Sequence, residues 1–173
     1  RDLLARELEG SEVYDPERLD WHGRTVAVAG GGPNLGESLD LVREADVVVA
    51  ASTAVDRLQS EGFAVDCMVT DLDKNPETVE RLTGSGVPVA VHAHGDNIPA
   101  VRSLFPAADP AYVIPTTQAR PVDGVYNFGG FTDGDRAAFL ADSAGAAALT
   151  FPGWDFDDPS VSEQKAKKLR WAE

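Results

Sequence analysis

Short apolar segments alternate with helix-like segments along this chain, and the alternation constrains its fold more than any other feature. The β-rich segments are residues 24–30, 46–50, 66–70, 87–92, 112–115, 124–128 and 146–151. The helix-like segments are residues 34–44, 53–60, 76–84, 98–105, 133–141 and 161–171. Strands that are apolar almost throughout, with helices between them, predict a parallel sheet covered on both faces. We therefore expect a single α/β domain over residues 1–173, built on a doubly wound, Rossmann-like, mostly parallel sheet.

The acidic charge of the chain limits its partners. The 173 residues include 29 acidic and 15 basic side chains, which gives a formal net charge of −14. Such a field repels nucleic acids and anionic membranes, so we expect neither as a partner and expect small-molecule substrates instead. The acids are spread along the chain, which is typical of halophilic proteins in salt that shortens the Debye length to about 3 Å. An anionic ligand would need a metal ion or local positive charge.

Location and assembly are constrained less strongly. No apolar run approaches the ~20 residues that span a bilayer, and no signal-peptide pattern follows Arg1, so we expect a cytoplasmic protein. Because the chain starts with arginine rather than methionine, we expect its ends to be trimmed. The single Cys67 lies in an apolar run and is expected to be a buried thiol. A homodimer is left open.

A glycine turn follows the first expected strand, at the edge where doubly wound folds bind ligands. Backbone N–H groups in such a turn can bind phosphate, and the expected phosphate or ribose contacts are Gly31, Gly32, Pro33 and Asn34. The turn fits a dinucleotide fingerprint only loosely, because no acid ends the second strand. A P-loop is excluded, since no Gly-Lys-Ser/Thr follows. The alternative is a tight turn with a purely structural role.

Two aspartates, Asp71 and Asp73, follow the third expected strand with one residue between them. Carboxylates at this spacing can converge on a hard cation, and Mg²⁺ prefers one or two carboxylates together with water and phosphate oxygens. Asp96, at the end of the neighbouring strand, is the expected third ligand. The alternative is that Asp71 caps a turn and Asp73 caps the helix that begins near Pro76.

The stretch VHAHGDN places His92, His94 and Asp96 at alternate positions, which could indicate a zinc site. The chain has one further histidine and one cysteine, so a full zinc ligand set is lacking. Magnesium, with His94 as a catalytic residue and His92 as a substrate-binding one, fits better. A hydrogen-bonded core role is the alternative for His92.

Other polar and small residues follow the remaining strands and are candidates for substrate binding. Gly129–Asp135 reads as a glycine-rich turn that enters a helix, either as simple capping or as a loop that holds a flat heterocycle with Phe131. The remaining candidates are Ser52, Thr53, Asn97, Thr117, Gln118, Asn127, Gly129, Gly130, Phe131, Thr132 and Asp133.

Five motifs together resemble one family. VTDLDKN, HAHGDN and NFGGFTDGDRA, with GGGPNLG near the start and GWDF near the end, resemble the archaeal 6-hydroxymethyl-7,8-dihydropterin pyrophosphokinases (the MptE type). That family is similar in fold to the catalytic domain of thiamin pyrophosphokinases. The resemblance implies Mg²⁺-dependent transfer of pyrophosphate from ATP, the co-substrate, to the pterin hydroxymethyl oxygen, with release of AMP, in folate or methanopterin synthesis. By motif it implies Mg²⁺ on Asp71, Asp73 and Asp96.

One departure and two other functions stay open. Thiamin pyrophosphokinases carry Ala-Asp-Gly-Ala after the second strand, where this chain has Ala51-Ser52-Thr53-Ala54, so the role of that loop is in doubt. A DxD-type transferase that uses a nucleotide sugar also needs paired aspartates and a divalent metal. A non-catalytic nucleotide-binding module would need only the GGGPNLG turn.

Overall fold

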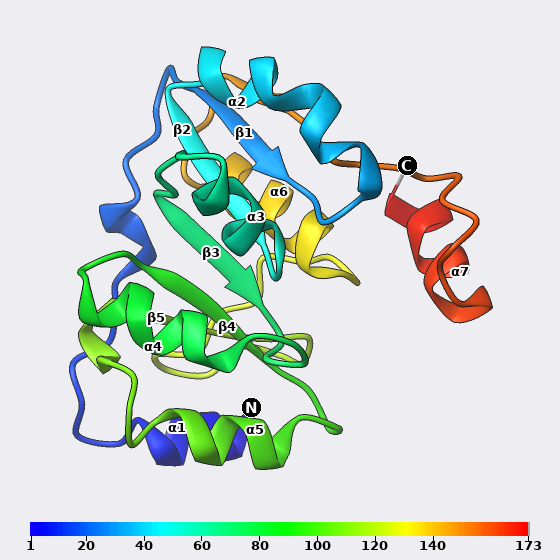
Figure 1. Cartoon of the computed structure of the whole chain (residues 1–173). Coiled ribbons are helices and arrows are strands. Elements are labelled where there is room, and N and C mark those ends of the chain that lie inside the picture. The colour runs from blue at the N-terminus through cyan, green and yellow to red at the C-terminus, as the bar shows by residue number, and fades with distance from the viewer. Residues whose placement is uncertain (173) are drawn as a thin grey trace.

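The computed structural model describes residues 1–172, which form a six-stranded parallel sheet between layers of helices (Figure 1). The strands are β1 (Thr25–Ala29), β2 (Val47–Ala51), β3 (Cys67–Thr70), β4 (Val89–Ala93), β5 (Val113–Thr117) and β6 (Ala148–Thr150). The helices are α1 (Asp2–Glu7), α2 (Leu39–Glu44), α3 (Ala54–Ser60), α4 (Pro76–Gly84), α5 (Ile98–Leu104), α6 (Asp133–Ser143) and α7 (Glu163–Ala172). This arrangement confirms the predicted α/β fold class.

Both faces of the sheet are buried, because side chains alternate along each strand. In β2, Val48 and Ala50 pack in one core with residues of α2, α3, α4 and α5, while Val47 and Val49 pack in a second core with α6. Side chains two apart share a face of a strand, so two buried faces require a continuous apolar run. The apolar runs of the sequence are therefore the direct signature of the two helical layers.

The strand order β5-β4-β3-β2-β1-β6 reverses direction once. The chain moves outward from β1 to β5 and then returns over the α6 face to place β6 on the other side of β1. The loops after β1 and β6 meet at this reversal, where the Gly30 and Gly32 N–H groups donate to the Pro152 and Gly153 carbonyls at 2.9 and 2.8 Å. Such a switch point, at the carboxyl ends of the strands, is where doubly wound folds bind ligands. In Figure 1 the arrowheads of β1 and β3 point toward α7.

Some predicted elements were wrong. Residues 124–128 add no strand to the sheet, because Gly124, at φ 71°, folds the chain into a turn closed by Val122 and Val125, and only Tyr126 bridges to β5. The predicted helix at 34–44 starts as a 3₁₀ segment, Pro33–Ser38, and is α-helical only from Leu39. Helix α1 was not predicted.

The start of α3 lies at Thr53, the first residue of the helix-like segment 53–60. The N-cap is Thr53, but no side chain caps the helix, and Ser52 adopts a φ of 49°. None of the helices in residues 1–172 is long and apolar enough to cross a membrane.

Candidate active site

A cavity of about 430 Å³, called here the main cavity, opens at the carboxyl ends of the strands. Its walls are the segments that follow β1, β2, β3 and β6, the first turn of α6, and α7. Nine of the predicted site residues line it: Gly31, Gly32, Ser52, Thr53, Asp71, Asp73, Phe131, Thr132 and Asp133. These nine residues follow three neighbouring strands, β1, β2 and β3, or lie at the start of α6, and the structure brings them together in a single polar cavity.

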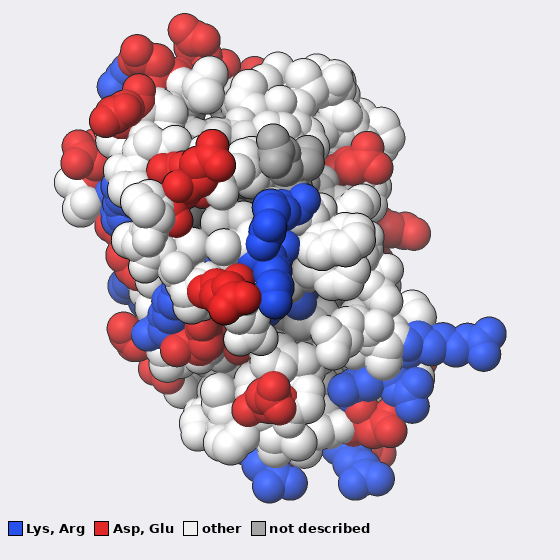
Figure 2. All heavy atoms as spheres, turned by 90° about the vertical axis from the view of Figure 1, so that its right-hand side faces the viewer, with Lys and Arg blue, Asp and Glu red and all other residues white. Residues whose placement is uncertain are grey.

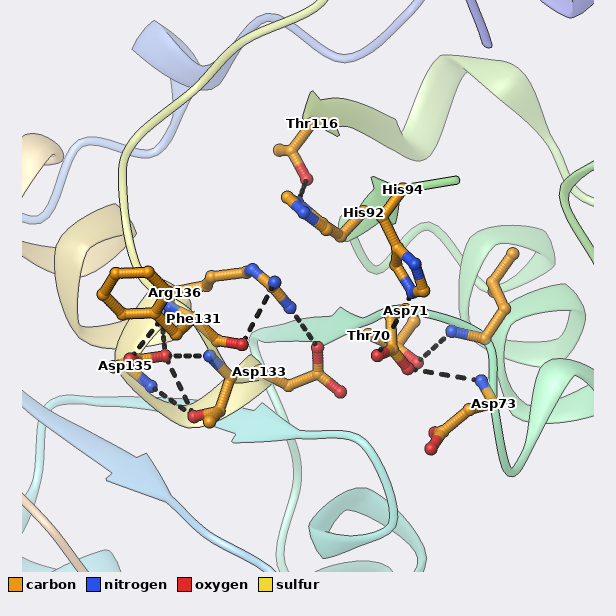
Figure 3. Close-up of polar contacts among 12 residues, drawn as sticks. Thr70, Asp71, Asp73, His92, His94, Thr116, Phe131, Asp133, Asp135 and Arg136 are labelled. Atoms are coloured by element: carbon orange, nitrogen blue, oxygen red, sulfur yellow. Dashed lines mark hydrogen bonds and ion pairs between the residues drawn. The ribbon is translucent and has the colours of Figure 1, made fainter. Parts of the chain in front are cut away.

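Three carboxylates meet in this cavity. Asp71, Asp73 and Asp133 each offer an oxygen, and these oxygens lie within 4.8 Å of one another. Figure 3 shows Asp133 reaching from the start of α6 toward the two aspartates that follow β3. We call these three residues the acidic cluster. Its third member was predicted to contact substrate rather than to join the aspartate pair.

The backbone after β3 explains how Asp71 and Asp73 come to the same side. Leu72, which is buried, adopts a φ of 68°, a region that non-glycine residues rarely occupy. The Leu72 N–H donates to Thr70 Oγ1 at 3.0 Å, and the Asp73 N–H donates to Asp71 Oδ1 at 3.3 Å. Asp71 therefore does cap a turn, as its alternative role required. Asp73 does not cap α4, whose N-cap is Asn75.

The first turn of α6 fixes Asp133. Thr132 is the N-cap and forms a capping box with Asp135: each side chain accepts a hydrogen bond from the backbone N–H of the other residue. These two bonds stabilise the start of the helix. Arg136 Nη1 donates to Asp133 Oδ1 at 3.2 Å, and its Nη2 donates to the Phe131 carbonyl at 3.2 Å. Figure 3 shows this bridge between Arg136 and the carboxylate. The Asp133 side chain is only 13% exposed.

Charge repulsion within the acidic cluster shows in the pKa values. Burial, followed by the neighbouring charge of Asp71, raises the pKa of Asp133 to about 7. Burial and the charge of Asp71 also raise the pKa of Asp73. A bound cation reduces the repulsion between neighbouring charged carboxylates. Hard divalent ions prefer ligand sets made only of oxygen atoms. The residues of the cluster therefore fit a bound Mg²⁺.

The β4 end supports the acidic cluster without joining it. Asn97 Nδ2 donates to the carbonyls of Asp71 and His92, both at 2.7 Å, and its Oδ1 accepts the His94 N–H at 3.0 Å. His94 Nε2 lies 3.7 Å from Asp71 Oδ2. Asp96 is exposed and is not among the acids whose oxygens gather within 4.8 Å in the described part of the chain. Its assignment as a metal ligand stays a prediction.

A second, small cavity of about 10 Å³ lies between the sheet and α6 and is lined by His92, Thr117, Gly129 and Arg136 among others. His92 Nδ1 lies 3.2 Å from Thr116 Oγ1. Within residues 1–172, His92 Nε2 and Arg136 Nε have no hydrogen-bond partner although both are buried. Burial and the charge of Arg136 lower the pKa of His92 to about 3, so the ring is neutral at physiological pH.

The glycine turn has a clear packing role. A Cβ atom at Gly32 would lie 2.5 Å from the Gly153 carbonyl oxygen, and one at Gly30 would lie 2.7 Å from it. The two loops can approach this closely only because both residues lack a side chain. Asn34 does not line the main cavity, because its Nδ2 donates to the Trp154 carbonyl at 3.0 Å.

Eight predicted residues line neither cavity. Gln118 is exposed, Asn127 holds its own loop through the Ala119 carbonyl and the Gly129 N–H, and Gly130 packs against Arg136. The eight are Pro33, Asn34, His94, Asp96, Asn97, Gln118, Asn127 and Gly130. Sequence reasoning missed the contribution of α7, whose Lys165, Lys168 and Leu169 line the main cavity. A signal was present, since three of the four lysines fall within this helix.

A doubly wound parallel domain with an acid-lined cavity at the carboxyl edge of its sheet is the arrangement of an α/β enzyme. The particular family follows from comparison with known sequences. The sequence model described as "6-hydroxymethylpterin diphosphokinase MptE-like" matches residues 6–160, and the chain belongs to this MptE-like family. The chain is accordingly an enzyme of the transferase class.

Three archaeal relatives carry the name 6-hydroxymethyl-7,8-dihydropterin pyrophosphokinase. The protein from Methanothermobacter thermautotrophicus is 42% identical over 160 residues, which cover 91% of this chain and 67% of the relative. The Pyrococcus furiosus protein is 40% identical over 85% of this chain and 68% of its own length. The Methanocaldococcus jannaschii protein is 31% identical over 98% of this chain and 81% of its own length.

Among solved structures, the Maf glycosyltransferase from Magnetospirillum magneticum AMB-1 is similar with a TM-score of 0.51. It is 17% identical, and the match covers 92% of this chain but only 29% of the glycosyltransferase chain. This likeness shows a shared fold and nothing about the reaction.

Proposed function

We propose that this chain transfers the diphosphoryl group of ATP to the hydroxymethyl oxygen of 6-hydroxymethyl-7,8-dihydropterin and releases AMP, in the cytoplasm. The observation that carries the proposal is the convergence of Asp71, Asp73 and Asp133 within 4.8 Å in a cavity that adjoins the glycine turn. The pterin acceptor is supported by the names of three archaeal relatives that are 31–42% identical to the chain.

The acidic cluster would hold Mg²⁺, with Asp133 as the third carboxylate. When bound, the cation would offset the charge of the polyphosphate and the charge that develops during transfer. The chain itself mainly positions the two substrates, since phosphoryl transfer asks for little covalent work from the protein. The turn after Leu72 and the capping box of α6 fix the carboxylates before any ligand binds.

His94 is our candidate for the acceptor of the hydroxymethyl proton. Its Nε2 lies 3.7 Å from Asp71 Oδ2, so it reaches the margin of the acidic cluster without belonging to it. The three aspartates would bind the cation, which would leave the His94 imidazole as the base beside the acidic cluster. A positioned general base contributes about 10²–10⁴-fold to a rate. The pterin ring would lie toward Phe131, which lines the main cavity and is 65% exposed.

The experiment that tests the proposal is incubation of the chain with ATP, Mg²⁺ and reduced hydroxymethylpterin in concentrated KCl. The expected result is AMP and pterin diphosphate in equal amounts, with AMP formed only when pterin is present. Formation of ADP, or turnover of a sugar nucleotide in place of ATP, would contradict the proposed reaction. Omission of Mg²⁺ is expected to stop product formation.

A further inference from the structure

Helix α7 forms the wall of the main cavity that faces the acidic cluster. Lys165, Lys168 and Leu169 line the cavity, and their spacing of three and four residues puts them on one face of the helix. Figure 2 looks at the side of the molecule where α7 lies, and a column of basic side chains crosses that face beside acidic ones. The cavity is thus acidic on one wall and basic on another.

A polyphosphate entering this cavity meets more negative than positive groups. The acids that line it outnumber the cations, which are three lysines: Lys74, Lys165 and Lys168. No arginine lines the main cavity in the described part of the chain. Arg136 is engaged with Asp133, and Arg57 Nη1 donates to the Gly32 carbonyl at 2.6 Å. Both guanidinium groups are therefore committed to holding the site together.

The glycine turn offers little compensation. The Gly30 and Gly32 N–H groups are already bonded to the carbonyls of Pro152 and Gly153. Of the three amides in this turn, only that of Gly31 lacks a partner within residues 1–172. One amide is a small contribution beside the two or more donors that a phosphate group normally receives. Positive charge for a polyphosphate must come from elsewhere in the cavity wall.

Two lysines of α7 are available for that purpose, and the third is not. Lys167 Nζ lies 3.4 Å from Glu163 Oε1 and does not line the cavity. Neither Lys165 nor Lys168 forms an ion pair within residues 1–172. Lys165 is close enough to Asp73 that its charge lowers the pKa of that carboxyl against the larger effect of burial. The positive charge of α7 therefore already reaches the acidic cluster.

We propose that Lys165 and Lys168 bind the phosphate chain of ATP in the main cavity and so complete the active site from α7. The inference deepens the proposed function, on which it rests for the identity of the nucleotide. The acidic cluster and its cation would hold the phosphates from the sheet side, and the two ammonium groups would hold them from the α7 side. Charge-assisted contacts of this kind are the strong ones in phosphate recognition.

The test compares nucleotide binding by two variants of the full chain. Lys165→Gln/Lys168→Gln removes both cavity lysines, and Lys167→Gln removes a neighbouring charge on the same helix as the matched control. Calorimetric titration would use α,β-methylene-ATP with Mg²⁺, since this analogue cannot be split at the reacting bond. We expect about tenfold weaker binding for each cavity lysine removed, which is about 100-fold for the double variant.

Two further readouts sharpen the result. AMP, with one phosphate, is expected to lose less than about tenfold in affinity in the double variant. Lys165→Arg/Lys168→Arg, which keeps both charges, is expected to stay within about tenfold of the unmodified chain. Lys167→Gln is expected to leave every affinity unchanged, so a general loss of surface charge would be recognised.

The outcomes separate this inference from the proposed function. Equal affinity for the triphosphate analogue in the double variant, the control and the unmodified chain would overturn the role of α7, even if pterin-dependent AMP formation were observed. Lysine-dependent binding without any pterin product would uphold the role of α7 and contradict the reaction. A chain that binds no nucleoside triphosphate at all would contradict both.

Discussion

Leu72 is the residue on which the geometry of the acidic cluster depends most. In a regular strand, the side chains of Asp71 and Asp73 would lie on the same face, and the backbone would continue in an extended conformation. Instead, a φ of 68° at Leu72 bends the chain, so that Asp71 Oδ1 accepts the Asp73 N–H. Backbone outliers of this kind cost about 1–3 kcal/mol and persist where the surroundings enforce them. The burial of the Leu72 side chain supplies that enforcement.

Removing one carboxylate from the acidic cluster should greatly reduce turnover without unfolding the protein. Asp71→Asn and Asp73→Asn are each expected to lower kcat by about 10²–10³-fold or more. Thermal unfolding of the metal-free variants should be unchanged or shifted upward, because each substitution relieves repulsion between neighbouring carboxylates. Steady-state AMP release and a thermal melt measure the two effects.

Asp96→Asn is the matched control for these variants. Asp96 is exposed and lies outside the acidic cluster. We therefore expect the kcat of the Asp96→Asn variant to stay within about twofold of that of the unmodified chain, as for a neutral surface substitution. Loss of turnover in Asp96→Asn, together with full activity in Asp133→Asn, would return the third ligand position to Asp96.

His92 should make the stability of the folded protein increase with pH. Its pKa is about 3 in the folded state and about 6.5 when exposed, so the unfolded chain binds the extra proton between these values. Stability contributed by the neutral ring is therefore complete above pH about 6.5 and is lost as the pH falls toward 3, by about 1.4 kcal/mol per pH unit.

Denaturant unfolding at pH 7 and pH 5 would measure this effect. His92→Gln should make the pH dependence shallower by about 1 kcal/mol per pH unit over that range. The imidazole resonances of His92 in NMR spectra should not shift between pH 8 and pH 5. A His92 titration with a midpoint near 6.5 would contradict the buried, neutral ring.

At the scale of single elements, the start of α6 links folding to the site. Thr132→Ala removes the capping box and should cost about 1 kcal/mol of unfolding free energy. Because Asp133 is the first residue of α6, the same change should also lower kcat. Ser143→Ala, at the other end of the helix, is the control and should change stability by less than about 0.5 kcal/mol. Equal effects of the two substitutions would show that the cap does not position Asp133.

The sequence correctly predicted those features that depend only on residues close together in the chain. Continuous apolar runs found the six strands, and the spacing of Asp71 and Asp73 after β3 found two members of the acidic cluster. The third member could not be found in this way. The connection from β5 back to β6 carries α6 across the sheet, and this path brings Asp133 to the cluster. Asp96 was predicted because β4 lies next to β3, but it is exposed in the turn before α5.

The sequence also did not predict the conformation of a segment that is set by one turn. The expected strand at 124–128 has suitable β-forming residues, but Gly124 folds it back on Val122 before it can pair along its length. The role of α7 was missed for another reason. A charged helix normally faces solvent, and only the path of the chain after β6 brings its lysines over the main cavity.

At the scale of the whole molecule, the net charge of −14 should make stability depend on salt. Self-repulsion acts over about 10 Å at 0.1 M salt and over about 3 Å at 1 M. We expect Tm to rise by about 5 °C or more between 0.1 M and 2 M KCl, which corresponds to about 2 kcal/mol. Sucrose at equal osmolality is the control, and a similar rise in sucrose would mean that charge screening is not the cause.

The most direct test of the central claim is a crystal of the chain grown with Mn²⁺ and α,β-methylene-ATP, with anomalous scattering used to locate the metal. The account predicts a manganese peak bound by oxygens of Asp71, Asp73 and Asp133, with the phosphate chain between the ion and α7. A peak bound instead by Asp96 and His94, or no peak near the acidic cluster, would contradict it.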